Sequence, residues 1–217
     1  MIKTFYFNQI RTCCYVISDD TKECVIIDPG FFEDREGERL YKYIEDQELT
    51  PKMILNTHGH ADHIIGNGRL SKKYNIPIYM NHKDLYLLEA AKDVAMQIFN
   101  KEIENPPRDV KDLEDGQILK FGHTELKVLA SPGHTPGGVA FYNKEGAYVM
   151  SGDSLFAGSI GRTDLPGGDL DTLMNSLKSN ILPLPYETQV YPGHGHATEI
   201  GIEMNENPFI TEQFDIN

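Results

Sequence analysis

The amino-acid sequence predicts an α/β fold in which sheets pack together and helices cover their outer faces. Short β-rich runs alternate with helical patterns along the chain. Runs in the middle of the chain are separated by tight turn signals, which is typical of antiparallel hairpins. No repeat and no Gly/Ser-rich linker divides the 217 residues. We therefore expect one domain over residues 1–217, because α/β domains of about 200–250 residues can fold as single units.

The first half of the chain predicts strands and helices in alternation. Residues 24–28 form a hydrophobic run that ends at a Pro-Gly turn signal, as a buried strand does. Residues 36–48 are charged but place Leu40 and Ile44 on one side, which is typical of an amphipathic helix. The other elements expected here are a strand over 53–56, a helix over 66–74 and a strand over 76–80.

A long helix is expected next, over residues 82–100, with apolar residues at steps of three and four as far as Ala95 and Ile98. Such a stripe packs into a core or covers a site as a lid, and the sequence leaves both roles open. The later elements expected are strands over 118–119, 126–128, 139–142, 148–150 and 189–191, a helix over 170–180 and a short helix after Thr198.

Composition narrows the class of protein. There are 20 Lys and Arg against 33 Asp and Glu, a formal charge of −13. This charge disfavours binding to nucleic-acid phosphates and to anionic membranes. No apolar run approaches the ~18 residues of a membrane span, and the first residues lack the order of a signal peptide. The three cysteines, Cys13, Cys14 and Cys24, suggest structural, reduced thiols. We expect a cytoplasmic protein with a small-molecule partner; the oligomeric state stays open.

Histidines and aspartates in the loops after four predicted strands carry the chemistry. Imidazole and carboxylate are ligands of divalent metals. Seven candidate ligands exceed one tetrahedral ion and suit two ions that share a carboxylate. No cysteine joins the group, which disfavours a purely structural zinc. The candidates are His58, His60, Asp62, His63, His134, Asp153 and His194.

These motifs match, in order and over almost the whole chain, those of the metallo-β-lactamase superfamily, which the sequence resembles. The resemblance implies a four-layer αβ/βα sandwich with a two-metal site at the loop ends. It assigns His58, His60 and His134 to the first ion. It assigns Asp62, His63 and His194 to the second ion, with Asp153 as a bridge. Asp28, before the Pro29-Gly30 turn, matches an aspartate that supports the ligand loop.

Within this superfamily the chain looks most like glyoxalase II, the hydroxyacylglutathione hydrolases, through residues 132–138, 152–156 and 161–169. That resemblance implies cleavage of a thioester such as S-lactoylglutathione by a hydroxide between two ions, with Asp62 and Asp153 as catalytic residues. Longer members carry a C-terminal helical domain that binds glutathione. Only 23 residues follow His194 here, so we expect no such domain. Arg162 is a candidate for binding a substrate carboxylate, the alternative being a surface arginine paired with Asp164.

Other activities share the same core. Iron-dependent persulfide dioxygenases resemble this chain through residues 57–63 and 161–164, and lactonases share the ligand motifs. The best-known β-lactamases have cysteine in place of Asp153, so β-lactam hydrolysis is disfavoured. We expect two divalent ions and favour zinc, although iron and manganese suit the same ligands.

Overall fold

A computed structural model of the chain describes residues 1–214 and contains two main sheets. The first sheet is antiparallel from β1 to β3 and parallel from β3 to β5. Its strands, in spatial order, are β1 (Ile2–Phe7), β2 (Thr12–Ser18), β3 (Glu23–Ile27), β4 (Thr50–Leu55) and β5 (Ile78–Tyr79). Strand order in this sheet therefore follows the chain.

The second sheet has six strands and is antiparallel except where β12 lies parallel to β9. Its strands, in spatial order, are β13 (Thr198–Glu199), β12 (Gln189–Pro192), β9 (Tyr148–Gly152), β8 (Val139–Asn143), β7 (Thr124–Ala130) and β6 (Ile118–Phe121). A two-stranded ribbon, β10 (Leu155–Phe156) with β11 (Ser159–Ile160), stands beside them.

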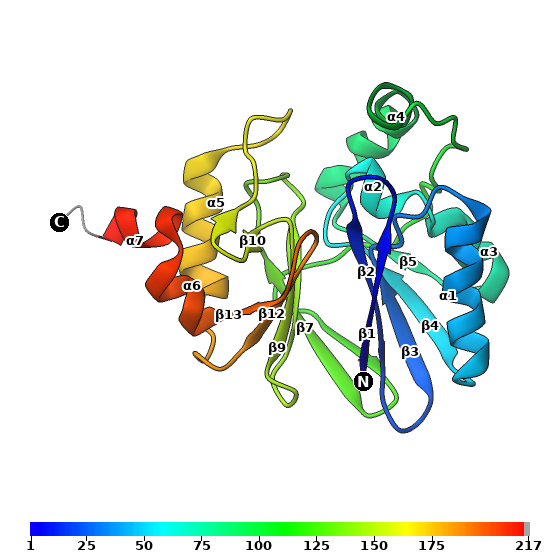
Figure 1. Cartoon of the computed structure of the whole chain (residues 1–217), viewed down its shortest axis with the longest axis horizontal. Helices are drawn as coiled ribbons and strands as arrows, with labels where there is room; N and C mark the ends of the chain where they lie inside the picture. Colours follow the sequence, from blue (N-terminus) through cyan, green and yellow to red (C-terminus); the bar gives the residue numbers. More distant parts are fainter. Residues whose placement is uncertain (215–217) are drawn as a thin grey trace.

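Helices cover the outer face of each sheet (Figure 1). On the first sheet lie α1 (Asp34–Asp46) and α3 (Asn67–Tyr74). At its upper edge in the figure lie α2 (Ala61–Ile64) and α4 (Leu85–Val94), with a 3₁₀ turn η1 (His82–Asp84) before α4 and a π-turn η2 (Ala95–Phe99) after it. On the second sheet lie α5 (Leu170–Ser176), the π-turn η3 (Leu177–Ile181), α6 (Ile200–Glu206) and α7 (Pro208–Phe214).

Three separate hydrophobic clusters establish four layers, which confirms the predicted αβ/βα sandwich. Ile26 of β3 packs outward in a cluster with Leu40 of α1. Its neighbour Ile27 points to the opposite face and packs in a central cluster with Phe141 of the second sheet. Leu173 of α5 belongs to the third cluster, outside the second sheet. Because successive side chains of β3 point to opposite faces of the sheet, this one strand contributes to both the outer and the central hydrophobic cluster.

The two parallel strand pairs determine where the site lies. Because β3 and β4 run in parallel, the residues that follow them, Asp28 and Thr57, emerge at the same edge of the first sheet. Because β9 and β12 run in parallel, Asp153 and His194 emerge together from the second sheet. Ligand-type residues from both sheets therefore meet where the two sheets face each other.

The region predicted as one helix over 82–100 is divided into a 3₁₀ turn, an α-helix and a π-turn. Its stripe packs into the first cluster as far as Ala95, which favours core packing over a lid. The expectation that Ile98 continues the stripe is wrong: Ile98 is 62% exposed and Phe99 is buried instead. The extra residue of the π-turn shifts the buried position by one.

Two further features bear on the sequence analysis. No strand was expected before Cys24, yet the β1–β2 hairpin forms the edge of the first sheet. Cys13 and Cys14 of β2 face different clusters, and both are buried and unpaired. Burial raises the pKa of both thiols, so they are poor nucleophiles, as expected for structural thiols. No helix among residues 1–214 is long and apolar enough to cross a membrane.

Candidate metal centre

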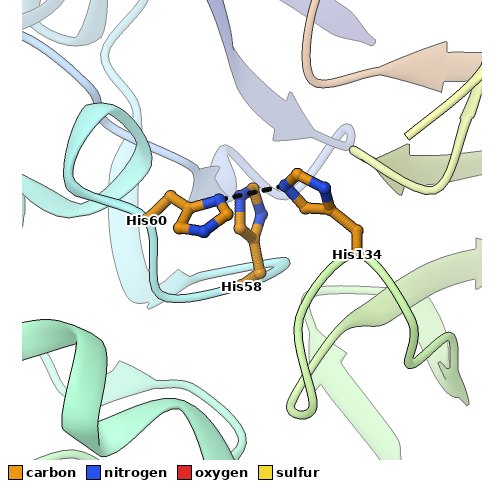
Figure 2. Close-up of side chains that lie close together, drawn as sticks. All are labelled: His58, His60 and His134. Atoms are coloured by element: carbon orange, nitrogen blue, oxygen red, sulfur yellow. Dashed lines mark hydrogen bonds between the residues drawn. The ribbon is translucent and has the colours of Figure 1, made fainter. Parts of the chain in front are cut away.

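Three histidines form a first group of ligand atoms. One ring nitrogen of each of His58, His60 and His134 lies within 4.8 Å of the other two. The imidazoles face one another, with Nδ1 of His60 3.0 Å from Nε2 of His134 (Figure 2). His58 and His60 follow β4, whereas His134 comes from the loop between β7 and β8. The first group therefore draws on both sheets.

A second group lies beside it and contains Asp62, His63 and His194, again with ligand atoms within 4.8 Å. Oδ2 of Asp62 is 3.2 Å from Nε2 of His63 and 3.3 Å from Nε2 of His194. Asp62 and His63 occupy the short helix α2, for which His60 is the N-cap residue. A single helical turn therefore separates ligands of the two groups.

Asp153 lies between the two groups. Its Oδ2 is 3.6 Å from Nε2 of His134 in the first group and 3.5 Å from Nε2 of His194 in the second. Its Oδ1 is 3.5 Å from Nε2 of His63. This position is the one that a shared carboxylate needs, and bridging by Asp153 stays a prediction.

Hydrogen bonds orient four of the imidazoles. Nδ1 of His134 donates to the carbonyl oxygen of Arg162 at 2.7 Å, and Nδ1 of His194 lies 3.2 Å from the carbonyl oxygen of Ile10. A carbonyl only accepts, so each neutral ring keeps its Nε2 lone pair toward the centre. Nδ1 of His63 faces Oδ2 of Asp28 at 3.1 Å, and Nδ1 of His58 faces the hydroxyl of its neighbour Thr57. Such outer partners fix ligand orientation in metal sites.

Asp28 is buried and holds the first ligand loop as well as one ring. Its Oδ1 accepts from the Thr57 amide at 2.8 Å and its Oδ2 from the Thr57 hydroxyl at 2.6 Å. The same Oδ2 faces His63. The structure thus places Asp28 where the supporting role predicted from the sequence requires it.

Unpartnered atoms show that this donor set fits cations. Nε2 of His58 and Oδ1 of Asp153 are buried without a hydrogen-bond partner among the described residues. Other nitrogen and oxygen atoms converge on the same space, as at His60 with His134 and at His63 with Asp62. Buried lone pairs of this kind are costly unless a cation lies among them. Imidazole and carboxylate without thiolate suit zinc, iron or manganese.

The pKa values of the histidines differ between the two groups. Burial, followed by repulsion from neighbouring histidines, lowers the pKa of His58 and brings that of His60 to about 3. Both rings are therefore neutral near pH 7, the form that binds metals. Burial alone would lower the pKa of His63, but Asp62, Asp153 and Asp28 raise it well above its ordinary value. The second group thus has the more negative surroundings and attracts positive charge.

Other candidate residues lie apart from these groups. The Arg162 guanidinium is exposed and makes two bonds to Asp164, from Nε at 2.8 Å and from Nη2 at 2.7 Å. This is the alternative arrangement considered for Arg162, and a role in substrate binding stays a prediction. His82, His123 and His196 are exposed and belong to neither group.

Sequence reasoning missed two buried side chains that hold candidate ligands or the loops beside them. Thr12 of β2 donates to Oδ2 of Asp62 at 2.7 Å. Asp84, just before α4, accepts from Gly59 and from Thr135, which are direct neighbours of candidate ligands. Neither residue lies in a recognisable motif; the only signal for Asp84 is a carboxylate at the start of an apolar helix, which usually indicates a cap.

Comparison with known proteins agrees with this architecture. Residues 11–194 match the family model described as the metallo-beta-lactamase superfamily. The chain is 40% identical to a probable metallo-hydrolase, YqgX, of Bacillus subtilis, with 90% of each protein covered. It is 38% identical to the hydroxyacylglutathione hydrolase GloC of Haemophilus influenzae, covering 92% of this chain and 93% of GloC.

Solved structures give the same result. The BLEG-1 B3 metallo-beta-lactamase superposes with a TM-score of 0.89 at 39% identity, covering 97% of this chain and 100% of the other. A di-iron form of TTHA1623 gives 0.85 at 40%, with 95% and 99% covered. ETHE1 from Myxococcus xanthus gives 0.77 at 26%, with 100% and 91% covered. With its family match, its fold and its paired His and Asp groups, this chain belongs to the metallo-β-lactamase superfamily of metallo-hydrolases.

Proposed function

We propose that the chain is a metal-dependent hydrolase that cleaves thioesters of the hydroxyacylglutathione class, such as S-lactoylglutathione. The observation that carries the proposal is the pair of ligand groups with Asp153 between them. Similarity to GloC over nearly the full length of both proteins supports the choice of thioester. The partner is then a small molecule, and a cytoplasmic location suits such a substrate.

The residues divide into two sets of ligands. His58, His60 and His134 would hold the first divalent ion, and Asp62, His63 and His194 would hold the second, with Asp153 contributing to both. When bound, such ions lower the pKa of a water toward ~7 and polarise the substrate carbonyl. We propose zinc, and the di-iron form of TTHA1623 makes iron the first alternative.

Asp62 provides a fixed carboxylate that can accept a hydrogen bond from water. Burial alone would raise its pKa, but His63 and His194 lower it well below the ordinary value, so the carboxylate stays charged at neutral pH. The hydroxyl of Thr12 donates to Oδ2 of Asp62 and restricts rotation of the carboxylate. Asp62 can thus orient a nucleophilic water. The leaving thiolate needs no general acid, because thiols have a pKa near ~8.5.

A second candidate is iron-dependent persulfide oxidation, favoured by the similarity to ETHE1. That activity would use one iron held by His58, His134 and Asp153, without His60 as a ligand. Because the chain is similar to BLEG-1, β-lactams should also be tested as substrates, although the sequence disfavours β-lactam hydrolysis. The three activities differ in what is consumed: water alone for thioesters and β-lactams, oxygen for persulfides.

The experiment is hydrolysis of S-lactoylglutathione by protein of measured metal content, followed through loss of the thioester. Asp153→Ala is expected to reduce turnover by at least about hundredfold, because a shared carboxylate positions both ligand groups. Asp93→Ala, which removes an exposed carboxylate on α4, is the matched control and is expected to keep full turnover.

Absence of turnover by metal-loaded protein would rule out the glutathione thioester. Oxygen uptake with glutathione persulfide by the iron-loaded protein would then identify the dioxygenase. Hydrolysis of a lactone or of a β-lactam by the zinc-loaded protein would identify another hydrolase on the same core.

A further inference from the structure

Asp84 is a fully buried carboxylate, 0% exposed, at the end of η1. Its Oδ2 accepts from the Gly59 amide at 2.9 Å and from the Thr135 hydroxyl at 2.8 Å. Its Oδ1 accepts from the Gly137 amide at 2.7 Å. Three donors thus satisfy one buried charge, and all of them come from loops rather than from its own helix.

Those donors flank every member of the first ligand group. Gly59 stands between His58 and His60, in the loop after β4 of the first sheet. Thr135 directly follows His134, in the loop between β7 and β8 of the second sheet. One carboxylate therefore ties together two loops that the topology supplies from opposite halves of the sandwich.

The loops approach Asp84 too closely to tolerate side chains. A Cβ at Gly59 would lie 2.9 Å from Cβ of Asp84, and a Cβ at Gly137 would lie 2.7 Å from its Cγ. Both positions are glycine, so the two backbones reach the carboxylate directly. The backbone of each loop therefore contacts the Asp84 side chain directly. A change in the position of this side chain would move both loops.

We infer that Asp84 is a positioning residue for the first metal ion, setting the spacing of His58 and His60 relative to His134. The inference uses the ligand roles of the proposed function. Asp84 touches no ligand ring; it acts through the amides and hydroxyl beside the rings. Asp28 differs in that it faces the His63 ring directly, in addition to accepting from Thr57 beside His58.

Asn at position 84 has the same shape but offers only one acceptor oxygen. If that oxygen takes the place of Oδ2, the amide NH₂ faces the Gly137 N–H, and two donors oppose each other. One loop must then move away from the other. Outer partners of metal ligands typically contribute about 10–100-fold in metal affinity, which is the loss expected for Asp84→Asn.

The experiment is a Zn²⁺ titration of metal-free protein in competition with a chromophoric chelator, in two backgrounds. His194→Ala removes a ligand of the second group, and Asp84→Asn added there is expected to weaken the remaining Zn²⁺ by about 10–100-fold. His134→Ala removes a ligand of the first group, and Asp84→Asn added there is expected to change affinity by less than about twofold, as for independent sites. Asp93→Asn is the matched exposed control and is expected to have no effect in either background.

Equal weakening in both backgrounds would overturn the inference, because it would indicate general support of the fold; no change in either would overturn it too. Thr135→Val removes only the hydroxyl donor and is expected to give a smaller loss confined to the His194→Ala background. This variant decides the matter if Asp84→Asn fails to fold. Because the readout is Zn²⁺ affinity, failure of the thioesterase assay leaves the result intact, and the reverse also holds.

Discussion

Gly193 shows how little room a single residue has beside the ligands. A Cβ built there would lie 2.0 Å from Oδ1 of Asp153 and 2.8 Å from Cε1 of His63. Its backbone cannot move aside, since its amide donates to Gly152 and its carbonyl accepts from Cys13. Only glycine fits between the Asp153 carboxylate and His63 of the second group.

Gly193→Ala is therefore expected to displace Asp153 and to reduce hydrolytic turnover by at least about hundredfold, the effect of a roughly 1 Å misplacement. Metal content and turnover of the purified variant provide the measurement. Gly68→Ala is the control, because the added Cβ on α3 meets only Pro107, at 3.3 Å. Full activity of Gly193→Ala would show that the Asp153 carboxylate is not held where we place it.

At this scale the sequence identifies candidate ligands but not the residues that hold them in place. His58, His60 and His63 stand together in a motif, so their spacing alone indicates metal binding. Thr12 lies 50 positions from Asp62 and reaches it only through the packing of β2 beside α2. A threonine in a strand carries no signal of its own, and only tertiary contacts assign it a role.

Among elements, the turns at the edge opposite the metal centre are joined by Asp19. It lies between β2 and β3, and its Oδ2 accepts from the His123 amide at 2.7 Å and from the Thr124 hydroxyl at 2.9 Å, both at the β6–β7 turn. Burial alone would raise its pKa, but hydrogen bonds from Thr21, His123 and Thr124 lower it to about 2. One carboxylate thus connects hairpins of the two sheets.

Asp19→Asn is expected to destabilise the fold near pH 7 by about 1–2 kcal/mol, the range for bonds to a partly exposed charged acceptor. Because the folded pKa is depressed, the stabilisation is present above the ordinary pKa of ~3.9 and is lost as the pH falls through about 2. Urea unfolding of the metal-free proteins across this range provides the measurement.

Asp20→Asn is the control for that series, since the side chains of Asp20 and His123 are 82% and 76% exposed and their contact contributes little. A difference between Asp19→Asn and the parent that stays constant down to pH 2 would contradict the assignment of the effect to ionised Asp19.

Strands and helices were predicted best where their apolar residues stand out clearly from the neighbouring sequence. Residues 24–27 form an unbroken apolar run, and the strand predicted over 24–28 lies within one residue of β3. Thr12–Ser18 is equally buried but mixes Thr, Cys and Ser with apolar residues, so no strand was expected. The π-turn at Ala95–Phe99 has no local sequence signal, which is why Ile98 and not Phe99 was assigned to the buried stripe.

On the scale of the whole molecule, the first ligand group spans the two halves of the sandwich, and the four-layer architecture was predictable from resemblance because its motifs are specific. Ligands from separate sheets are brought together only in the folded chain. Bound metal therefore contributes to folding stability, because it binds the native state in preference to the unfolded chain.

Removal of each ion is expected to lower the melting temperature by about 8–16 °C when free metal had been 1,000-fold above Kd, from about 4 kcal/mol of stabilisation per site and about 2–4 °C per kcal/mol at this chain length. Calorimetry with and without a chelator provides the measurement. The double variant His58→Ala/His194→Ala is expected to be insensitive to the chelator. A chelator effect of equal size in that variant would show that the stabilising ion binds elsewhere.

The separation of the ligands along the chain also governs when the centre can form during synthesis. His63 and His194 are 131 residues apart. At roughly 5–20 residues per second, a ribosome needs about 7–26 s to make the segment between them. During that time the inner face of the first sheet has been synthesised but the second sheet that covers it has not. Asp62 and His63 therefore lack His194, the third member of their group. We therefore expect the second group to be complete only after His194 has been made and β12 has paired with β9.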